Sequence, residues 1–407
     1  MPSDGAVPDV LMEGRPFKAV HRPTSAREVG EILRDADNLK KPLAPLGGGS
    51  SLALGNPPDE IDAALDLRAL NRVLHFEPAD LTLSVEAGAR FAGVQATLAE
   101  RGQTLPIEVP DADRATIGGL IATALAGPRR LGSGTLRDLL IGISVAYPSG
   151  IVAKAGGLVV KNVTGFDLMR LHHGALGTLG VIVSANFKTV PLHRAETTLS
   201  ANFESLDAAF AASDRIRGSR IQPLALEIRK LSDQFELSLR IAGRASTVAL
   251  LASEGTGLFA RAVIAQGNDE SVRWWATYVQ DQTLLQPGRV LIRCGAAPKE
   301  TAQLAGELLA TLAERALTPA LFAISPGLGS ILIGLPAASL TAKSLAGLQS
   351  HLLGSSAHVT IMVAPPELKE GIDIWGRWPE TLSVMRALKA EFDPNRIINP
   401  GRMVGRI

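Results

Sequence analysis

The stretch PLGGGSS at residues 45–51 places three consecutive glycines after a short apolar run, and a second glycine pair follows in ATIGGL at residues 115–120. Each stretch offers backbone N–H groups that no side chain shields, which binding an anion such as pyrophosphate requires. Alone, Gly47–Gly49 is typical of a flexible turn. Together with the hydroxyls of Ser50 and Ser51, the two loops predict a phosphate cradle for a dinucleotide.

This pair of loops differs from the common nucleotide-binding signatures. No G-x-G-x-x-G opens a predicted helix, as a Rossmann fold requires, and no G-x-x-x-x-G-K-[ST] marks a P-loop. Another fold is therefore expected to present the glycines.

Composition sets the broad class of the protein. The chain has 407 residues, 46% hydrophobic and 20% charged, with a formal net charge of +1. That length allows two or three domains, and the balanced charge gives no electrostatic footprint for nucleic acid. One cysteine, Cys294, excludes a disulfide framework, an iron–sulfur cluster and a cysteine zinc site within the chain. We expect no signal peptide, no membrane-spanning helix and a cytoplasmic location.

Hydrophobic periodicity predicts an α+β chain. A capping box at Ser25–Glu28 begins a helix, and residues 139–147 read as a buried strand. After Pro191, strands and helices follow the order β-α-β-β-α-β twice, which is typical of a duplicated ferredoxin-like unit over one antiparallel sheet. A last helix at 379–392 precedes a tail rich in proline, glycine and asparagine at 393–407.

These motifs resemble the PCMH-type FAD-binding domain of the vanillyl-alcohol-oxidase superfamily. The segments that carry the resemblance are residues 45–51, 66–73, 85–88, 115–119, 134–138, 161–168 and 177–182, with the closing motif at 392–402. AGPRR at 126–130 and KNVTGFDL at 161–168 are similar to the FAD-binding subunits of glycolate oxidase (glycolate dehydrogenase) complexes.

The resemblance implies a division into domains. Residues 1–195 would form a PCMH-type FAD-binding domain of two α+β subdomains. Residues 196–375 would form a ferredoxin-like, antiparallel-sheet cap domain of the kind that binds substrate. Residues 376–407 would form a C-terminal helix and tail that return to the FAD domain.

The resemblance also implies a cofactor, FAD, and the residues that hold it. Gly47–Ser51 would bind the pyrophosphate from one side and Thr116–Gly119 from the other, while Thr123 and Gly127 would lie along the flavin. Ile182 would cover the adenine end, with an ordinary core strand residue as the alternative. The full set is Leu46, Gly47, Gly48, Gly49, Ser50, Ser51, Pro110, Thr116, Ile117, Gly118, Gly119, Thr123, Gly127 and Ile182. Binding is expected to be non-covalent, because the first loop has no histidine to bond the flavin.

Catalytic and metal-binding groups are harder to find. The histidine-rich metal motif of the superfamily's D-2-hydroxy-acid dehydrogenases is absent, so no metal is expected. His172 and His173 point to different faces if helical, and such a pair is typical of a basic helix C-terminus. No catalytic base is identified. His358 is the best candidate, with a sheet-edge histidine as the alternative. Arg129 and Arg130 face the flavin or an anion, with a solvated loop pair as the alternative.

The function that the resemblance implies is that of one subunit in a complex. The complex would oxidise glycolate, and D-lactate as a further substrate, to the 2-oxo acid. This chain would work beside a larger FAD-containing subunit and an iron–sulfur subunit that takes the electrons instead of NAD. Contact with the inner membrane face would be indirect, through those partners. Two alternatives stay open, namely a self-sufficient FAD-dependent D-2-hydroxy-acid dehydrogenase and a non-catalytic assembly subunit.

Overall fold

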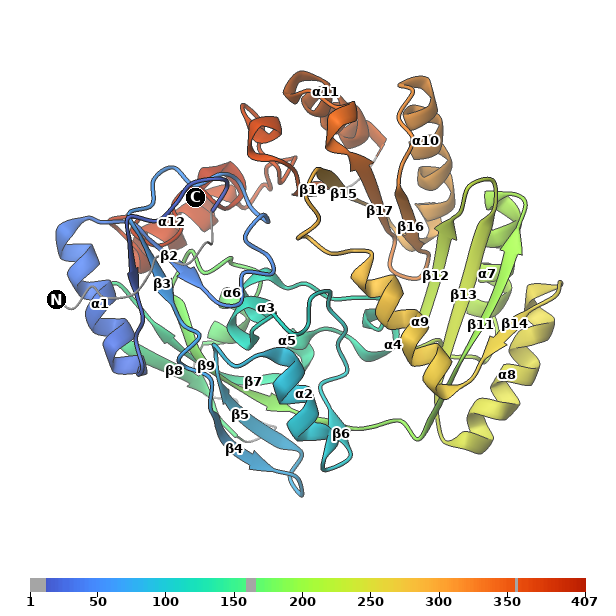
Figure 1. Ribbon diagram of the computed structural model, residues 1–407, viewed down its shortest axis with the longest axis horizontal. Coiled ribbons are helices and arrows are strands. Elements are labelled where there is room, and N and C mark those ends of the chain that lie inside the picture. The colour runs from blue at the N-terminus through green and yellow to red at the C-terminus, as the bar shows by residue number, and fades with distance from the viewer. Residues whose placement is uncertain (1–11, 159–165, 356–357) are drawn as a thin grey trace. The chain divides into compact units, whose positions relative to one another are not determined.

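The computed structural model describes residues 12–158, 166–355 and 358–407, which pack into two compact units (Figure 1). The first unit runs to Leu125 and includes Thr135–Leu192 and Asp373–Ile407. The second consists of Ala126–Gly134 and His193–Ile372. The short stretch Ala126–Gly134 therefore packs away from its neighbours in sequence. Part of the KNVTGFDL motif, residues 161–165, lies outside the described residues.

Short strands and helices alternate in the first unit. Its elements are β1 (Ala19–His21), α1 (Ala26–Leu39), β2 (Leu43–Leu46), β3 (Ala63–Asp66), β4 (Val73–Glu77), β5 (Thr82–Glu86), α2 (Phe91–Ala99), β6 (Gln103–Thr104), α3 (Ile117–Thr123), α5 (Leu136–Leu139), β7 (Leu140–Ala146), β8 (Val152–Gly156), α6 (Leu168–His172), β9 (Val181–Lys188), β10 (Val190–Pro191), α12 (Leu382–Phe392) and η4 (Val404–Arg406).

These elements build the two expected α+β subdomains. A parallel sheet has the order β1-β3-β2, and an antiparallel sheet has the order β4-β5-β9-β7-β8. The capping box predicted at Ser25–Glu28 is only half formed at α1, where the Ser25 Oγ accepts from the amide of Glu28 at 3.2 Å. The Glu28 carboxylate accepts from the amide of Thr24 at 2.7 Å, one residue earlier than a capping box requires.

The C-terminal tail returns to the first unit, as the sequence predicts. The amide of Leu43 donates to the carbonyl of Ile397 at 2.6 Å, and the amide of Asn399 donates to the carbonyl of Leu43 at 3.0 Å. The tail therefore lies alongside β2, the strand that leads into the first glycine loop. Ile397 and Ile398 are buried in the core that also contains Val29 of α1.

Longer strands and helices form the second unit. Its elements are α4 (Arg130–Ser133), β11 (Ala195–Phe203), α7 (Leu206–Arg217), β12 (Ala225–Lys230), β13 (Phe235–Gly243), α8 (Ala245–Phe259), β14 (Ile264–Gln266), α9 (Asn268–Gln280), β15 (Arg289–Gly295), η1 (Pro298–Glu300), α10 (Thr301–Glu314), β16 (Leu321–Ser325), β17 (Ser330–Pro336), η2 (Ala337–Ser339), α11 (Ala342–Ser355), β18 (His358–Val363) and η3 (Pro366–Lys369).

The duplication predicted from element order is confirmed by the topology. The eight-stranded sheet has the order β14-β11-β13-β12-β16-β17-β15-β18. Each half therefore repeats the arrangement in which the first and third strands of a β-α-β-β-α-β unit are central. The halves join through antiparallel β12 and β16, where Ile228 pairs with Ile324. Helix α9 lies between the two rounds and was not predicted.

The two faces of this sheet differ in chemistry. Leu199 pairs with Leu239, which pairs with Leu226, so that one face is apolar. Gly255 of α8 lies against Leu199 and Leu239, and α7, α10 and α11 continue the same helix layer (Figure 1). On the other face, the alternate positions of β11, β12 and β13 hold polar residues such as Ser200, Ser238 and Glu227. Helix α9 covers part of it.

Candidate functional site

The first glycine loop begins where β2 ends. A Cβ added to Gly48 would lie 1.4 Å from the carbonyl oxygen of Arg114, and one added to Gly47 would lie 2.1 Å from the Oγ1 of Thr116. Gly49 has a φ of 76°, which is left-handed backbone. Glycine is therefore required here because the two loops approach each other so closely.

The second loop is held by other motif segments that stack beneath it. The amide of Gly118 donates to the carbonyl of Ala87 at 2.7 Å, and the amide of Gly88 donates to the carbonyl of Leu70 at 2.8 Å. A Cβ on Gly88 would lie 2.0 Å from the carbonyl oxygen of Leu67. The motif segments at 66–73, 85–88 and 115–119 are therefore hydrogen-bonded to one another in that order, and this stacking holds the second glycine loop against the first.

Both loops line one cavity of about 90 Å³. The predicted residues on its wall are Gly47, Gly48, Gly49, Ser50, Ser51, Thr116, Gly119 and Thr123. Residues 48–51 are partly buried, and no acceptor contacts their amides within the described part of the chain. Amides without acceptors in a partly buried loop favour an anionic ligand with several oxygens. A diphosphate fits this requirement.

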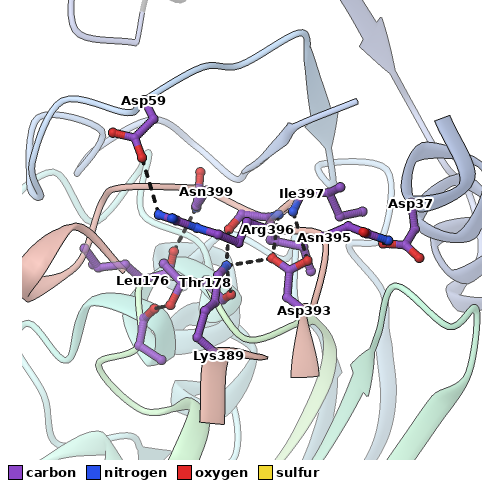
Figure 2. Close-up of polar contacts among 12 residues, drawn as sticks. Asp37, Asp59, Leu176, Thr178, Lys389, Asp393, Asn395, Arg396, Ile397 and Asn399 are labelled. Carbon is purple, nitrogen blue, oxygen red and sulfur yellow. Dashed lines mark hydrogen bonds and ion pairs between the residues drawn. The ribbon is translucent and has the colours of Figure 1, made fainter. Parts of the chain in front are cut away.

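Two residues of the closing motif also line this cavity, and the sequence did not single them out as cofactor-binding. Asn399 is 6% exposed, and its Nδ2 donates to the carbonyl of Leu176 at 2.8 Å (Figure 2). Its Oδ1 has no partner among the described residues. Arg402 donates to the carbonyl of Leu52 at 2.6 Å. Burial lowers the pKa of Arg402 to about 10, so it remains charged at neutral pH.

A second cavity of about 660 Å³ adjoins the first and shares Gly48 and Thr116 with it. Asp66 on its wall is buried and lies 2.7 Å from Arg68 and 3.5 Å from Arg22. Burial alone would raise the pKa of Asp66, but the hydrogen bonds from Arg68 outweigh it and the pKa is lowered. The larger cavity has the volume of a typical small-ligand site. A diphosphate at the loops would thus leave room for a nucleoside beside it.

Several predicted residues lie away from the loop cavity. Leu46, Ile117 and Ile182 are core residues, and Ile182 pairs with Val145 in the antiparallel sheet. Gly118 is packed against Ala87. The remaining two are Pro110, which is half-buried in a loop, and Gly127, which lines a cavity of the second unit. Contact of these residues with FAD stays a prediction.

The histidines differ in part from expectation. His172 lies in the last turn of α6, so the predicted helix C-terminus is confirmed. Burial lowers the pKa of His172 to about 4, so this side chain carries no positive charge toward the helix dipole at neutral pH. Its Nε2 lies 2.9 Å from the hydroxyl oxygen of Tyr147. His358 is exposed on the edge strand β18, which is the alternative the sequence left open. No group of three or more potential metal ligands occurs among the residues described here.

A cavity of about 40 Å³ in the second unit gathers charged residues that sequence analysis missed. Arg130 was a candidate, but Glu227 and Arg293 were not. Glu227 and Arg293 each lie between two apolar residues in a strand. A charged residue in that position was the sequence signal that could have marked them as candidate site residues. Only the sheet register could show that they meet.

Comparison with known families identifies the class of protein. Residues 17–156 match the FAD binding domain family, and residues 192–278 and 376–403 match the C-terminal domain of FAD linked oxidases. Together these stretches make up more than half of the chain. The chain belongs to the FAD-linked oxidases, and its first unit contains a PCMH-type FAD-binding domain.

Curated proteins similar to this chain include glycolate oxidase subunits and a D-lactate dehydrogenase. The chain is 35% identical over 197 residues to glycolate oxidase subunit GlcE of Escherichia coli (strain K12), a match that covers 48% of this chain and 55% of that protein. It is 32% identical over 209 residues to glycolate oxidase subunit GlcD of Bacillus subtilis (strain 168), covering 51% and 44%. These matches thus span about half the length of either relative. A D-lactate dehydrogenase of Archaeoglobus fulgidus is 26% identical over 420 residues, covering 95% of this chain and 91% of the relative.

Solved structures confirm the fold. Two structures of alkyldihydroxyacetonephosphate synthase match with TM-scores of 0.70 and 0.71 at 16% and 17% sequence identity. They cover 95% and 96% of this chain, and 77% and 78% of the matched chains. At this identity the likeness shows the fold alone. Within the described ranges, no helix is long and apolar enough to cross a bilayer.

Proposed function

We propose that this chain is the FAD-binding subunit of a glycolate dehydrogenase-type complex that oxidises glycolate to glyoxylate, with D-lactate as a second substrate. Its partners are a larger FAD-containing subunit, which carries the main substrate site, and an iron–sulfur subunit, which accepts the electrons in place of NAD. The complex lies in the cytoplasm and meets the inner membrane only through its partners. Support comes from the 35% identity to subunit GlcE of Escherichia coli over 197 residues, about half of the chain.

The loop cavity is the observation that carries this proposal. The amides of residues 48–51 would bind the diphosphate of FAD, with the hydroxyls of Ser50 and Ser51 as further donors. The buried Oδ1 of Asn399 would accept a hydrogen bond from a cofactor hydroxyl. When bound, the flavin supplies a hydride acceptor. The chain's own contribution is to hold the diphosphate where both loops exclude bulk water.

The path of the electrons follows from the cysteine count. A cluster needs several thiolates, and the sequence contains Cys294 alone. Cys294 is also fully buried in β15. A one-electron chain therefore has to begin on a partner, which is why the proposal places the iron–sulfur centre outside this chain.

Visible absorption spectra test the proposal. We expect the purified chain to be yellow and to keep its flavin oxidised when glycolate is added without air. When the chain is co-purified with the larger flavin subunit and the iron–sulfur subunit, glycolate should reduce its flavin, and the visible flavin absorbance should decrease. A colourless chain that still binds both partners would favour a non-catalytic assembly role, and would contradict the proposal.

A self-sufficient dehydrogenase is the second candidate. One observation favours it, because the Archaeoglobus fulgidus D-lactate dehydrogenase aligns along 95% of this chain and 91% of its own length. That relative therefore contains both units. Bleaching of the isolated chain by D-lactate or glycolate would support this candidate over the subunit role.

A further inference from the structure

A groove on the first unit lies between α12, the closing motif and the segment that joins β2 to β3. Its space of about 440 Å³ is in the range of small-ligand sites. Three arginines line it, namely Arg386 of α12, Arg396 of the closing motif and Arg406 of η4. Asp59 lines it from the segment after β2. The groove lies within the first unit and shares no residue with the loop cavity.

Arg396 and Arg406 are held in place by other groups of the groove. The Arg396 Nη2 donates to the carbonyl of Arg406 at 2.8 Å and lies 3.4 Å from the Asp59 carboxylate (Figure 2). The Arg406 Nη2 donates to the Asp59 Oδ1 at 2.6 Å and to the carbonyl of Pro57 at 3.0 Å. Asp59 thus holds two guanidinium groups at one carboxylate. The Nε and Nη1 of Arg396 and the Nη1 of Arg406 contact no acceptor among the described residues.

Arg386 forms no ion pair with any residue that the structure describes. Its guanidinium lies over the exposed ring of Trp378, 5.7 Å from the ring centroid. Trp378 is itself fixed, since its Nε1 donates to Asp373 at 3.0 Å, and the same carboxylate accepts from the amide of Gly405 at 2.7 Å. The Arg386 Nη2 is 3.6 Å from the position of a Cβ added to Gly405, next to Arg406. An indole ring beneath a guanidinium restricts its motion and leaves its N–H groups available to a ligand.

The wall of the groove carries more positive than negative charge. Lys389 also lines the groove, but its cation is paired with Asp393 at 2.6 Å. The three guanidinium groups then face one side-chain carboxylate, that of Asp59. A terminal carboxylate at Ile407, which also lines the groove, would still leave the cations in excess. Several guanidinium forks with uncompensated charge favour an anion that has more than one charge and more than two oxygens.

We propose that this groove binds the phosphate group of a small phosphate ester. A phosphate monoester carries a charge of about −1.5 to −2 at pH 7 and three terminal oxygens that accept hydrogen bonds. A carboxylate has one charge and two oxygens, so it satisfies fewer of the donors. The organic part of the ester would lie on the apolar part of the wall, which is formed by Ala390, Pro394 and Ile407.

The closing motif connects this groove with the loop cavity. Arg396 comes three residues before Asn399, which lines that cavity, and the amide of Asp59 donates to the carbonyl of Pro400 at 3.1 Å. A phosphate that contacts Arg386 as well as Arg396 and Arg406 would join α12 to the tail. Because such a ligand binds the folded chain only, it should stabilise the tail by mass action. This site goes beyond the proposed function and does not depend on it.

Isothermal titration of the full chain, as purified, tests the site. Inorganic phosphate and ethyl phosphate are the probes, and sodium nitrate at equal ionic strength is the monoanion control. We expect both phosphates to bind and nitrate not to bind. Arg386→Gln should weaken phosphate binding by about tenfold, the loss expected for one charge-assisted hydrogen bond. Arg386→Lys keeps the charge but not the planar fork, so its affinity should lie between those of the native chain and Arg386→Gln.

Two further variants locate the bound phosphate. Arg406→Gln removes a second guanidinium of the groove and should also weaken binding. Arg101→Gln removes an exposed charge elsewhere in the first unit and should leave the affinity unchanged, with circular dichroism confirming that each variant is folded.

Three results would overturn the site. One is no heat of binding for the native chain, and another is equal phosphate affinity in the native chain and Arg386→Gln. The third is release of bound flavin by phosphate, which would place the anion at the glycine loops. Binding of inorganic phosphate without ethyl phosphate would show an adventitious ion only and would contradict the ester. Because heat of binding to the chain alone is the readout, these results are separate from whether the chain oxidises glycolate.

Discussion

Lys389 and Asp393 form an ion pair inside the first unit, with 2.6 Å between the Lys389 Nζ and the Asp393 Oδ2 (Figure 2). Their side chains are 4% and 0% exposed. The Lys389 Nζ also donates to the carbonyl of Thr178 at 2.7 Å, and Asp393 accepts from the amides of Ile397 and Ile398 at 2.9 Å. One pair thus ties α12 to the closing motif and to the loop before β9. Because Asp393 holds the amides of Ile397 and Ile398 just before Asn399, we infer that this pair helps to position the wall of the loop cavity that Asn399 and Arg402 form.

Removing one partner of this pair should be strongly destabilising. Lys389→Met leaves a buried carboxylate without its cation, and we expect a loss of about 3–5 kcal/mol in the free energy of unfolding. Urea unfolding measures it. Arg406→Gln is the matched control, since it breaks the exposed ion pair with Asp59 at 2.6 Å and should cost less than about 1 kcal/mol. Equal losses in the two variants would show that burial does not strengthen the pair.

The buried His172 should make stability depend on pH. Burial lowers its pKa from 6.5 to about 4, so the unfolded chain binds a proton between these values while the folded chain does not. The contribution of His172 to the free energy of unfolding is therefore fully present above pH 6.5. It is lost as the pH falls toward 4, by roughly 3 kcal/mol in total. The variant His172→Gln keeps an acceptor for Tyr147 but does not titrate, so its unfolding free energy should fall less steeply over this range.

A second histidine variant controls for the rest of the chain. His75 is exposed on β4, and His75→Gln is the matched change of histidine to glutamine at a surface position. Equal slopes for His172→Gln and the native protein would contradict the assignment of this window to His172.

Much of the fold was predictable, because it follows from local signals. The Ser25 cap and the alternation of strands and helices after Pro191 are read directly from the order of residues, and the structure has both. Helix α9 was missed, since its exposed face is polar and its buried face is the aromatic group around Trp275, which gave no clear period. The sequence also gave no sign that Lys389 and Asp393 are buried, because their i,i+4 spacing is the same as that of an exposed ion pair on a helix.

Of the candidate sites, the one formed by contiguous residues was predicted, and the one formed by distant residues was missed. The glycine loops were predicted because an anion cradle needs a short contiguous stretch of a special residue type. Glu227 and Arg293 were missed as a site because they are 66 positions apart in the chain. Only antiparallel pairing through β16 and β17 brings their strands together on one face. A charged residue in an apolar strand was the available signal, but nothing in the sequence indicated its partner.

The glycines of the two loops should be essential for FAD. In Gly48→Val the new side chain would have to occupy the space of the Arg114 carbonyl, so the loops would separate and the variant should be purified without flavin. The ratio of flavin to protein absorbance measures occupancy. Gly306→Ala in α10 is the control, because nothing lies within 4 Å of its added Cβ, and it should keep full flavin. Full occupancy in Gly48→Val would mean that the loops are only turns.

The bound flavin should be released by denaturation. The first loop reads Gly49-Ser50-Ser51 and contains no histidine that could bond the cofactor. Precipitation with acid, or heating, should therefore leave a colourless pellet and place all FAD in the supernatant, where its fluorescence is measured. Flavin that remains on the denatured chain would contradict non-covalent binding.

Turnover should depend on the partner subunits. The isolated chain has a single, buried cysteine and cannot carry a cluster, so electrons leaving its flavin have no one-electron acceptor within the chain. Because the proposed function also places the main substrate site on the larger flavin subunit, we expect negligible oxidation of glycolate by the isolated chain even with artificial acceptors. Robust oxidation should appear once the larger flavin subunit and the iron–sulfur subunit are present. Cys294→Ser in the reconstituted complex should keep nearly all activity, because this thiol packs as a small apolar group in β15. Substantial turnover by the isolated chain would replace the subunit role by that of a self-sufficient dehydrogenase.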